Sequence, residues 1–325
     1  MLAPVWDCVP ARTTLAAVEP VYGTVIQLAR LVWRVQGLKF TVTGVENLPR
    51  TGGAVIAINH TSYFDFTFAG LPAYQQGLGR KVRFMAKKEV FDHKVTGPIM
   101  RSLRHIEVDR PSGAASVEEA CRKLREGEFV GVYPEATISR SFEIKQFKSG
   151  AARMAIAAGV PIVPHIVWGA QRIWTKGHPK KLGRTKVPIS VAVGKPIEPT
   201  LPAAELTSLL HSRMQHLLEQ VQDAYEIQAP HPPGEFWVPH RLGGGAPTLA
   251  EANRMDAEEA AYKAALRAGT PGPDTGTTGR PGKPAPKTHS RPHETGRNPE
   301  CRLLLEKKKK HIYNTLHTTN PPHSI

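Results

Sequence analysis

The chain has 325 residues, of which 40% are hydrophobic, which suffices for one large domain or two small ones with a real core. Lys and Arg outnumber Asp and Glu by 43 to 28, giving a net charge of +15. This charge suits an anionic membrane, nucleic acid or a phosphorylated substrate, and cannot choose among them. The widely spaced cysteines exclude a disulfide framework and indicate reduced thiols: Cys8, Cys121 and Cys301. No Cys-x-x-Cys or His-Glu-x-x-His spacing occurs, so no metal is expected.

The first 36 residues show no secretion signal, and no confident transmembrane span of roughly 20 uncharged residues occurs in the chain. Segment 18–35 is typical of an amphipathic helix. Its predicted apolar face consists of Tyr22, Val25, Ile26, Ala29, Val32 and Trp33. This face allows two interpretations, because the helix can lie in a membrane interface or pack on the domain that follows.

From residue 37 onward, strand-like and helix-like segments alternate along the chain. Strands are expected at 39–43, 54–58, 82–85, 106–108, 129–133, 162–167 and 189–193. Helices are expected at 93–103, 116–126, 149–158, 205–227 and 249–268. The alternation predicts an α/β fold with a central, mostly buried sheet flanked by helices.

Composition divides the chain into four parts. An N-terminal amphipathic segment, 1–36, precedes the main domain at 37–228. A Pro/Gly connector and a surface helix follow at 229–268. The tail, 269–325, has ten Lys or Arg against four Asp or Glu and many Pro, Gly and Thr. Because that composition cannot support a core, the tail is predicted to be disordered and basic.

The most informative stretch is Asn59-His60-Thr-Ser-Tyr-Phe-Asp65, directly after the strand expected at 54–58. If His60 lies just outside a following helix and Asp65 in its early turns, the carboxylate can fold back onto the imidazole. A carboxylate on one ring nitrogen fixes the tautomer and leaves the other nitrogen as a general base. No serine or cysteine nucleophile is needed if the substrate brings its own hydroxyl. The alternative is a structural histidine at a strand end.

Further clusters follow predicted strands, and sites in open α/β sheets gather at strand ends. Arg110 follows the strand at 106–108, and Pro161 and Pro164 shape an apolar wall. A third cluster follows the strand at 129–133 and offers an acceptor, hydroxyls and cations: Glu135, Thr137, Ser139, Arg140, Lys145 and Lys148. Each cluster alone also fits turn chemistry or solvated charge, but their order is hard to ascribe to chance.

These blocks resemble those of the glycerolipid acyltransferase family, in particular the bacterial 1-acyl-sn-glycerol-3-phosphate acyltransferases. The first block of that family, Asn-His-x4-Asp, is matched by Asn59, His60 and Asp65. The second ends in an arginine, matched by Arg110 in IEVDR, and the fourth is matched by VPIVP at 160–164. The resemblance covers roughly residues 35 to 200.

The third block, commonly FPEGTRS, reads YPEATIS in this chain. Ala136 replaces the glycine and Ile138 replaces the arginine with which the family holds the acceptor's phosphate. Arg140, Lys145 or Lys148 can supply that charge instead. The departure puts the identity of the acceptor in more doubt than the histidine and aspartate.

The resemblance implies direct acyl transfer from acyl-CoA or acyl carrier protein to the hydroxyl of 1-acylglycerol-3-phosphate, giving phosphatidate. His60 would act as the general base and Asp65 would orient it. Backbone amides near the third block or after His60 would stabilise the oxyanion. Arg110 and Arg140 would anchor the phosphate, and Glu135 would position the acceptor or these arginines. No cofactor beyond the thioester co-substrate is expected.

The resemblance also favours the membrane-contacting interpretation of the N-terminal helix. The expected location is peripheral, on the cytoplasmic face of the plasma membrane, with the anionic membrane surface rather than nucleic acid as partner. Two other functions stay open. The chemistry can act on a different lysophospholipid or lipid alcohol, or the chain can be a non-enzymatic, basic membrane- or nucleic-acid-binding protein.

Overall fold

The structure is a computed structural model, and it describes residues 19–77, 80–109 and 113–267. All of these lie in the first of two structural units, Met1–Pro284. Arg110, Cys8, Cys301 and the tail predicted at 269–325 lie outside the described residues.

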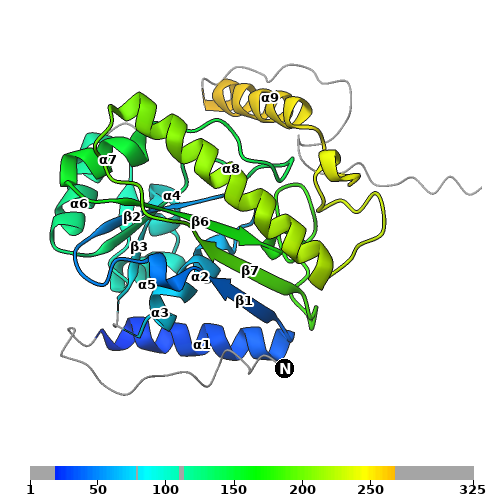
Figure 1. The fold of residues 1–325 in the computed structure, drawn as a ribbon, viewed down its shortest axis with the longest axis horizontal. Helices are drawn as coiled ribbons and strands as arrows, with labels where there is room; N and C mark the ends of the chain where they lie inside the picture. The colour runs from blue at the N-terminus through cyan, green and yellow to red at the C-terminus, as the bar shows by residue number, and fades with distance from the viewer. Residues whose placement is uncertain (1–18, 78–79, 110–112, 268–325) are drawn as a thin grey trace, which may run out of the picture. The chain divides into compact units, whose positions relative to one another are not determined.

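A seven-stranded mixed sheet forms the centre of the described part of the chain (Figure 1). In spatial order its strands are β1 (Lys39–Thr43), β7 (Pro188–Val193), β6 (Ile162–Trp168), β2 (Ala54–Ile58), β5 (Phe129–Val132), β3 (Val82–Lys87) and β4 (Ile106–Val108). Strands β6, β2, β5, β3 and β4 run parallel, whereas β7 is antiparallel to β6 and parallel to β1. The predicted α/β class with a central buried sheet is confirmed.

Helices cover both faces of this sheet, and the strands place alternate side chains on each face. In β2, Ala54, Ile56 and Ile58 join one core cluster, and Val55 and Ala57 join the other. The first cluster is completed by α1 (Pro20–Gln36), α2 (Asp65–Ala69) and α3 (Leu71–Gln75). The second is completed by α6 (Gly113–Arg125), α7 (Gly150–Ala158) and α8 (Ala203–Gln228). Burial on both faces explains why the central strands read as continuous apolar runs.

Two predicted helices differ from the observed ones. The helix expected at 93–103 is observed as the shorter α5 (Thr96–Ser102), because His93 has an extended backbone, and an unpredicted helix, α4 (Lys88–Asp92), precedes it. Helix α6 begins at Gly113, so Ser116 lies buried inside the helix. Residues 249–267 form α9 (Leu249–Arg267), close to the predicted surface helix.

Helix α1 packs most of its predicted apolar face on the domain. Tyr22, Val25 and Trp33 line a narrow apolar cavity of about 90 Å³ together with Phe66 and Phe84 from the domain. The packing interpretation therefore holds for this face. A second apolar stripe of α1, the exposed stripe, remains at the surface: Val21, Leu28, Leu31, Val32 and Val35. No helix among the described residues is long and apolar enough to cross a membrane.

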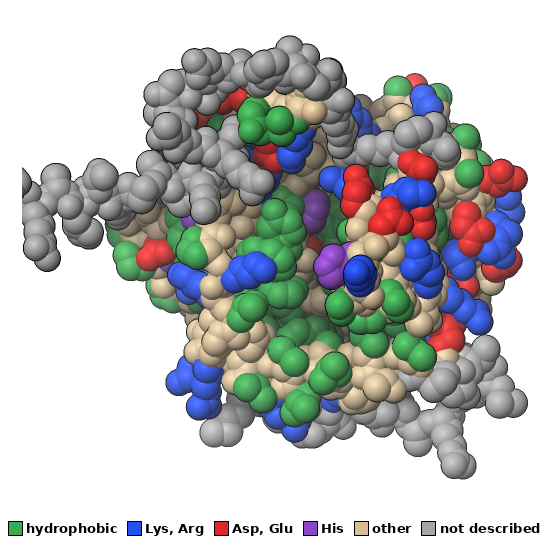
Figure 2. Space-filling model, turned by 180° about the vertical axis from the view of Figure 1, so that it is seen from behind, with side chains coloured by type: hydrophobic (Ala, Val, Ile, Leu, Met, Phe, Trp, Pro, Cys, Tyr) green, Lys and Arg blue, Asp and Glu red, His purple; other side chains and the backbone are tan. Residues whose placement is uncertain are grey.

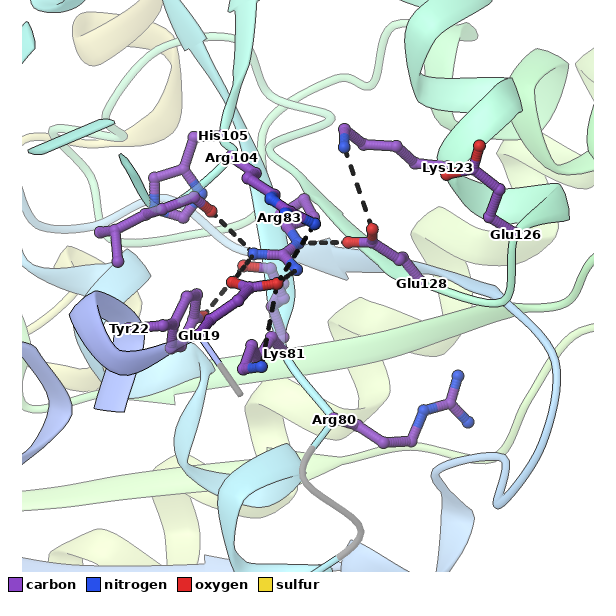
Figure 3. A network of polar contacts seen from close by, with 12 residues as sticks. Glu19, Tyr22, Arg80, Lys81, Arg83, Arg104, His105, Lys123, Glu126 and Glu128 are labelled. Atoms are coloured by element: carbon purple, nitrogen blue, oxygen red, sulfur yellow. Dashed lines mark hydrogen bonds and ion pairs between the residues drawn. The ribbon is translucent and has the colours of Figure 1, made fainter. Parts of the chain in front are cut away.

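A buried arginine fixes the start of α1 to the sheet (Figure 3). Arg83 on β3 donates to both carboxylate oxygens of Glu19 at 2.7 and 3.0 Å, and it also pairs with Glu128. The hydrogen bond from Arg83 lowers the pKa of Glu19 although burial opposes this shift. A bidentate, charge-assisted contact of this kind sets orientation as well as attachment. It holds α1 with one apolar face inward and the exposed stripe outward.

Candidate active site

Three loops meet at one edge of the sheet. Strands β2, β5 and β6 are parallel neighbours, so the segments that follow them, 59–64, 133–149 and 169–178, leave the same edge. The second segment joins the first where the Ser139 N–H donates to the His60 carbonyl at 2.7 Å. The third joins it where the Thr175 hydroxyl donates to the Thr61 carbonyl, also at 2.7 Å. The predicted meeting of the clusters after β2 and β5 is confirmed, whereas the segment 169–178 was not predicted as part of the site.

His60 and Asp65 form a hydrogen-bonded pair at this edge. The His60 Nδ1 atom lies 3.0 Å from the Asp65 Oδ2 atom. Asp65 is the first residue of α2 and His60 precedes the helix, as the sequence predicted. The Asp65 side chain is 0% exposed and the His60 side chain 19% exposed. Because Nδ1 is engaged, the free nitrogen of this accessible ring is Nε2.

The Asp65 carboxylate is held by the backbone of its own loop. Its Oδ2 atom accepts the N–H groups of Thr61 and Ser62, each at 2.8 Å, in addition to the His60 ring. Burial raises the pKa of Asp65, and the hydrogen bonds from His60, Ser62 and Thr61 oppose that shift. The carboxylate therefore has one fixed orientation, with a lone pair directed at the imidazole.

The backbone amides after His60 are already engaged. Thr61 and Ser62 donate to Asp65, the Tyr63 N–H donates to the Trp174 carbonyl at 3.2 Å, and the Phe64 N–H donates to the Ser62 hydroxyl at 3.1 Å. The prediction that these amides form an oxyanion pocket is therefore wrong. Any such donors have to come from elsewhere in the site.

Glu135 holds the backbone at His60, and its predicted role in positioning the acceptor or the arginines stays a prediction. The Glu135 side chain is buried, with Oε1 accepting the His60 N–H at 2.8 Å and Oε2 accepting the Lys145 N–H at 3.0 Å. Burial raises the pKa of this carboxyl to about 8, against the opposing effect of these donors and the Lys145 cation. Glu135 thus ties the loop after β5 to the loop after β2.

Removing the Glu135 carboxylate should lower the stability of the protein. Glu135→Ala leaves two buried N–H groups without their acceptor, at about 1–3 kcal/mol each. We expect the free energy of unfolding in urea to fall by roughly 2–5 kcal/mol. The matched control, Glu118→Ala, removes an exposed carboxylate from α6 and should leave the unfolding midpoint nearly unchanged. Equal midpoints for the two variants would contradict this role of Glu135.

Tyr133 is a site residue that the sequence analysis missed. Its ring stacks on the His60 ring with centroids 4.1 Å apart and an interplanar angle of 24°. Burial raises the pKa of Tyr133 well above its ordinary value, so the ring is neutral. Its position was a usable signal, because Tyr133 directly follows β5 and lies two residues before Glu135. Both residues therefore leave the sheet at the same edge. The stack limits rotation of the imidazole.

Ala136 occupies the position where the resembled pattern has glycine, and its backbone is left-handed. Its φ is +61°, a region that costs a residue with a Cβ atom about 1–2 kcal/mol. The turn that glycine would favour is thus retained, held by the Ala136 N–H donating to the Tyr133 carbonyl at 3.0 Å.

Ala136→Gly should therefore stabilise the protein. Relief of the left-handed strain exceeds the entropy that glycine adds to the unfolded chain, and we expect a gain of about 1 kcal/mol. Urea unfolding with an unchanged slope is the measurement. A lower midpoint in the glycine variant would show that Ala136 makes contacts worth more than the strain.

The predicted phosphate-binding groups differ from one another in burial and in their partners. Arg140 and Lys145 are buried and form ion pairs with carboxylates of α9, and Thr137 accepts a hydrogen bond from the Lys145 ammonium at 2.8 Å. Lys148 is exposed. Ile138, in the place of the family's arginine, is buried and carries no charge.

The prediction that two prolines wall the site is wrong. The Pro161 carbonyl accepts the N–H of Val55 near the start of β2, at the opposite edge of the sheet from His60. Pro164 pairs with Ala57 in the middle of the sheet and packs near Gly194. The apolar run of this block builds the sheet core instead.

One face of the molecule is hollowed and apolar. Figure 2 shows hydrophobic side chains gathered in a hollow, with histidine side chains exposed at its edge. Such a surface suits a ligand with one long apolar part and one polar reacting part.

The chain is similar to a known protein family and to several of its named members. A family model described as "Acyltransferase" matches residues 39–168. The 1-acyl-sn-glycerol-3-phosphate acyltransferase of Bacillus subtilis is 30% identical over 184 residues, which cover 53% of this chain and 84% of that protein. The enzyme of the same name from Limnanthes douglasii is 31% identical over 160 residues, 48% of this chain and 54% of that protein. The crystal structure of a 1-acyl-sn-glycerophosphate acyltransferase from Thermotoga maritima aligns with a TM-score of 0.48 and 20% identity, over 62% of this chain and 88% of that one.

Proposed function

The chain belongs to the family of the 1-acyl-sn-glycerol-3-phosphate acyltransferases, and on this premise we propose that it acylates the free hydroxyl of 1-acylglycerol-3-phosphate to give phosphatidate. The family implies a lysophospholipid acceptor and an acyl donor. The single observation that carries the proposal is the His60–Asp65 pair, a buried carboxylate 3.0 Å from one nitrogen of a partly exposed imidazole.

The chemistry follows from the tautomer. Asp65 accepts a hydrogen bond from the Nδ1–H group of His60, so Nε2 carries a lone pair toward the open side of the ring. Nε2 takes the proton of the acceptor hydroxyl as its oxygen attacks the thioester carbonyl. When the tetrahedral intermediate collapses, the C–S bond breaks and the proton on Nε2 passes to the leaving thiolate. Binding of both substrates together makes the attack effectively intramolecular.

The test is a panel of purified lysolipids with a radiolabelled acyl thioester, supplied both as acyl-CoA and as acyl carrier protein. We expect lysophosphatidate to be the preferred acceptor, judged by kcat/KM. A uniform absence of product with every acceptor and both donors would refute the proposal, and the two donors together identify the thioester that the enzyme uses.

A second candidate acceptor is a different lysophospholipid or lipid alcohol. It is favoured by Ile138, which puts a buried apolar side chain where the family has an arginine for phosphate. Preference in the same panel for an acceptor with another headgroup would select this alternative while leaving the chemistry of His60 unchanged.

We further propose that the exposed stripe of α1 contacts the anionic membrane in which acceptor and product reside. A continuous row of large apolar side chains facing solvent suits the boundary between headgroups and acyl chains. The triple change Leu28→Ser, Leu31→Ser and Val35→Ser should reduce sedimentation with phosphatidylglycerol vesicles by about tenfold or more. The inward face of α1 is untouched, so the helix should stay attached.

The matched control for this membrane prediction is Ile227→Ser, which removes an exposed apolar side chain near the end of α8. It should leave vesicle binding unchanged. Equal binding by the triple variant and the wild type would contradict a membrane role of the stripe.

A further inference from the structure

Three cations on the loops that hold His60 form ion pairs with two carboxylates of α9. The basic cluster consists of Arg140, Lys145 and Lys176. Asp256 accepts from Lys145 at 2.5 Å, from Lys176 at 2.8 Å and from Arg140 at 3.2 Å. Glu259 accepts from Lys176 at 2.7 Å and from Arg140 at 2.8 Å. Helix α9 lies outside the segment 39–168 that the family model matches.

The basic cluster is built on the backbone that holds His60. Arg140 directly follows Ser139, whose N–H donates to the His60 carbonyl. Lys176 directly follows Thr175, whose hydroxyl donates to the Thr61 carbonyl. The backbone of Lys145 is joined to that of His60 through the two oxygens of Glu135. The backbone that carries each of the three cations is therefore linked to the backbone of the His60 loop.

Helix α9 is attached mainly by charge. Among its described side chains, Ala252 is the only buried apolar one. Asp256 lies four residues after Ala252, and Glu259 lies three residues after Asp256. One face of the helix therefore presents both carboxylates to the basic cluster. Burial opposes ionisation of Glu259, but contacts with Lys176, Lys263 and Arg140 outweigh it and lower its pKa to about 2. An attachment made by ion pairs can be exchanged for another anion without exposing a core.

We propose that the basic cluster is the binding site for the acceptor's phosphate, and that Asp256 and Glu259 occupy it as an internal competitor that the phosphate displaces. This inference rests on the proposed function. A phosphate monoester carries about −1.5 to −2 charge and several acceptor oxygens, which match what the two carboxylates now supply. Displacement of α9 thereby couples opening of the site to arrival of a phosphorylated acceptor.

The test compares the full-length wild type with the double variant Asp256→Asn, Glu259→Gln. Removing the competitor raises the fraction of molecules with an open site, and the apparent dissociation constant falls in proportion. We expect the KM for lysophosphatidate to fall roughly three- to tenfold, with kcat within about twofold of the wild type. The matched control, Glu258→Gln, changes an exposed carboxylate of the same helix and should leave KM unchanged. An unchanged or higher KM in the double variant would overturn the proposal.

Binding without turnover separates this proposal from the proposed function. Calorimetric titration with glycerol 3-phosphate should show tighter binding to the double variant than to the wild type. Adding Lys176→Ala to the double variant should cancel the gain. Equal affinity of the wild type and the double variant would overturn the inference even in an active enzyme, whereas the expected difference in a protein without acyltransferase activity would refute only the proposed function. If the double variant fails to fold, Glu259→Gln alone, which leaves Asp256 in place, should show a smaller gain, and no gain would overturn the inference.

Discussion

His60→Ala should lower the rate of acyl transfer by about 10²–10⁴-fold while the protein stays folded. The change removes the nitrogen that accepts the hydroxyl proton, and no other imidazole in the described part of the chain is hydrogen-bonded to Asp65. The 60–61 backbone keeps its bonds to Glu135, Ser139 and Thr175, because these involve main-chain atoms of the histidine loop. Thioester release, measured beside circular dichroism, checks both parts of the expectation.

The control for this change is His93→Ala, which removes an exposed histidine between α4 and α5. Its rate should equal that of the wild type. Turnover by the His60 variant at a rate near that of the control would remove this residue from the chemistry.

Asp65→Asn should also lower kcat by about 10²–10⁴-fold. The amide keeps the volume of the carboxylate but replaces one oxygen with an N–H₂ donor. Because His60, Thr61 and Ser62 all donate to Oδ2, the amide oxygen can take that place, but the negative charge that stabilises the protonated imidazole is lost. The loss should fall on kcat rather than on KM, because Asp65 is buried and has no contact with an acceptor.

Because Asp65 anchors its loop, its amide variant needs a stability measurement. Urea unfolding distinguishes a lost charge from a lost fold, and Asp109→Asn, at a partly exposed carboxylate, is the control. A folded Asp65 variant with wild-type kcat would show that the imidazole needs no partner.

A protein that only bound lipid or nucleic acid would not need the contact between His60 and Asp65. Binding to anionic surfaces needs cations at the surface, whereas the site centres on a buried carboxylate aimed at an imidazole. The basic cluster of Arg140, Lys145 and Lys176 is itself neutralised by α9. The arrangement thus favours chemistry on a bound ligand over attraction to a charged surface.

Local patterns predicted most of the secondary structure and the histidine–aspartate pair. The strands at 54–58 and 106–108 were predicted to the residue, because buried apolar runs bounded by turns leave little choice. The pair was predictable because both partners lie within five residues, where the start of a helix fixes the geometry. The short helix α4 was missed, and α5 begins three residues later than predicted because the backbone at His93 is extended.

The contacts that a single sequence could not supply are the long-range ones. Glu135 meets the His60 backbone across 75 positions, and Arg140 meets Glu259 across 119. Nothing local distinguishes a glutamate that binds substrate from one that accepts two backbone N–H groups. The two prolines were misplaced for a different reason, because Pro161 lies just before β6 and Pro164 lies inside it, and neither follows the carboxyl end of the strand.

The most direct test of the central claim is the release of free thiol from acyl-CoA by the wild-type protein, with and without lysophosphatidate. If the imidazole activates the acceptor's own hydroxyl, thiol should appear only when lysophosphatidate is present, in one-to-one ratio with phosphatidate. A burst of thiol equal to the protein concentration in the absence of acceptor, with the acyl group left on the chain, would contradict it.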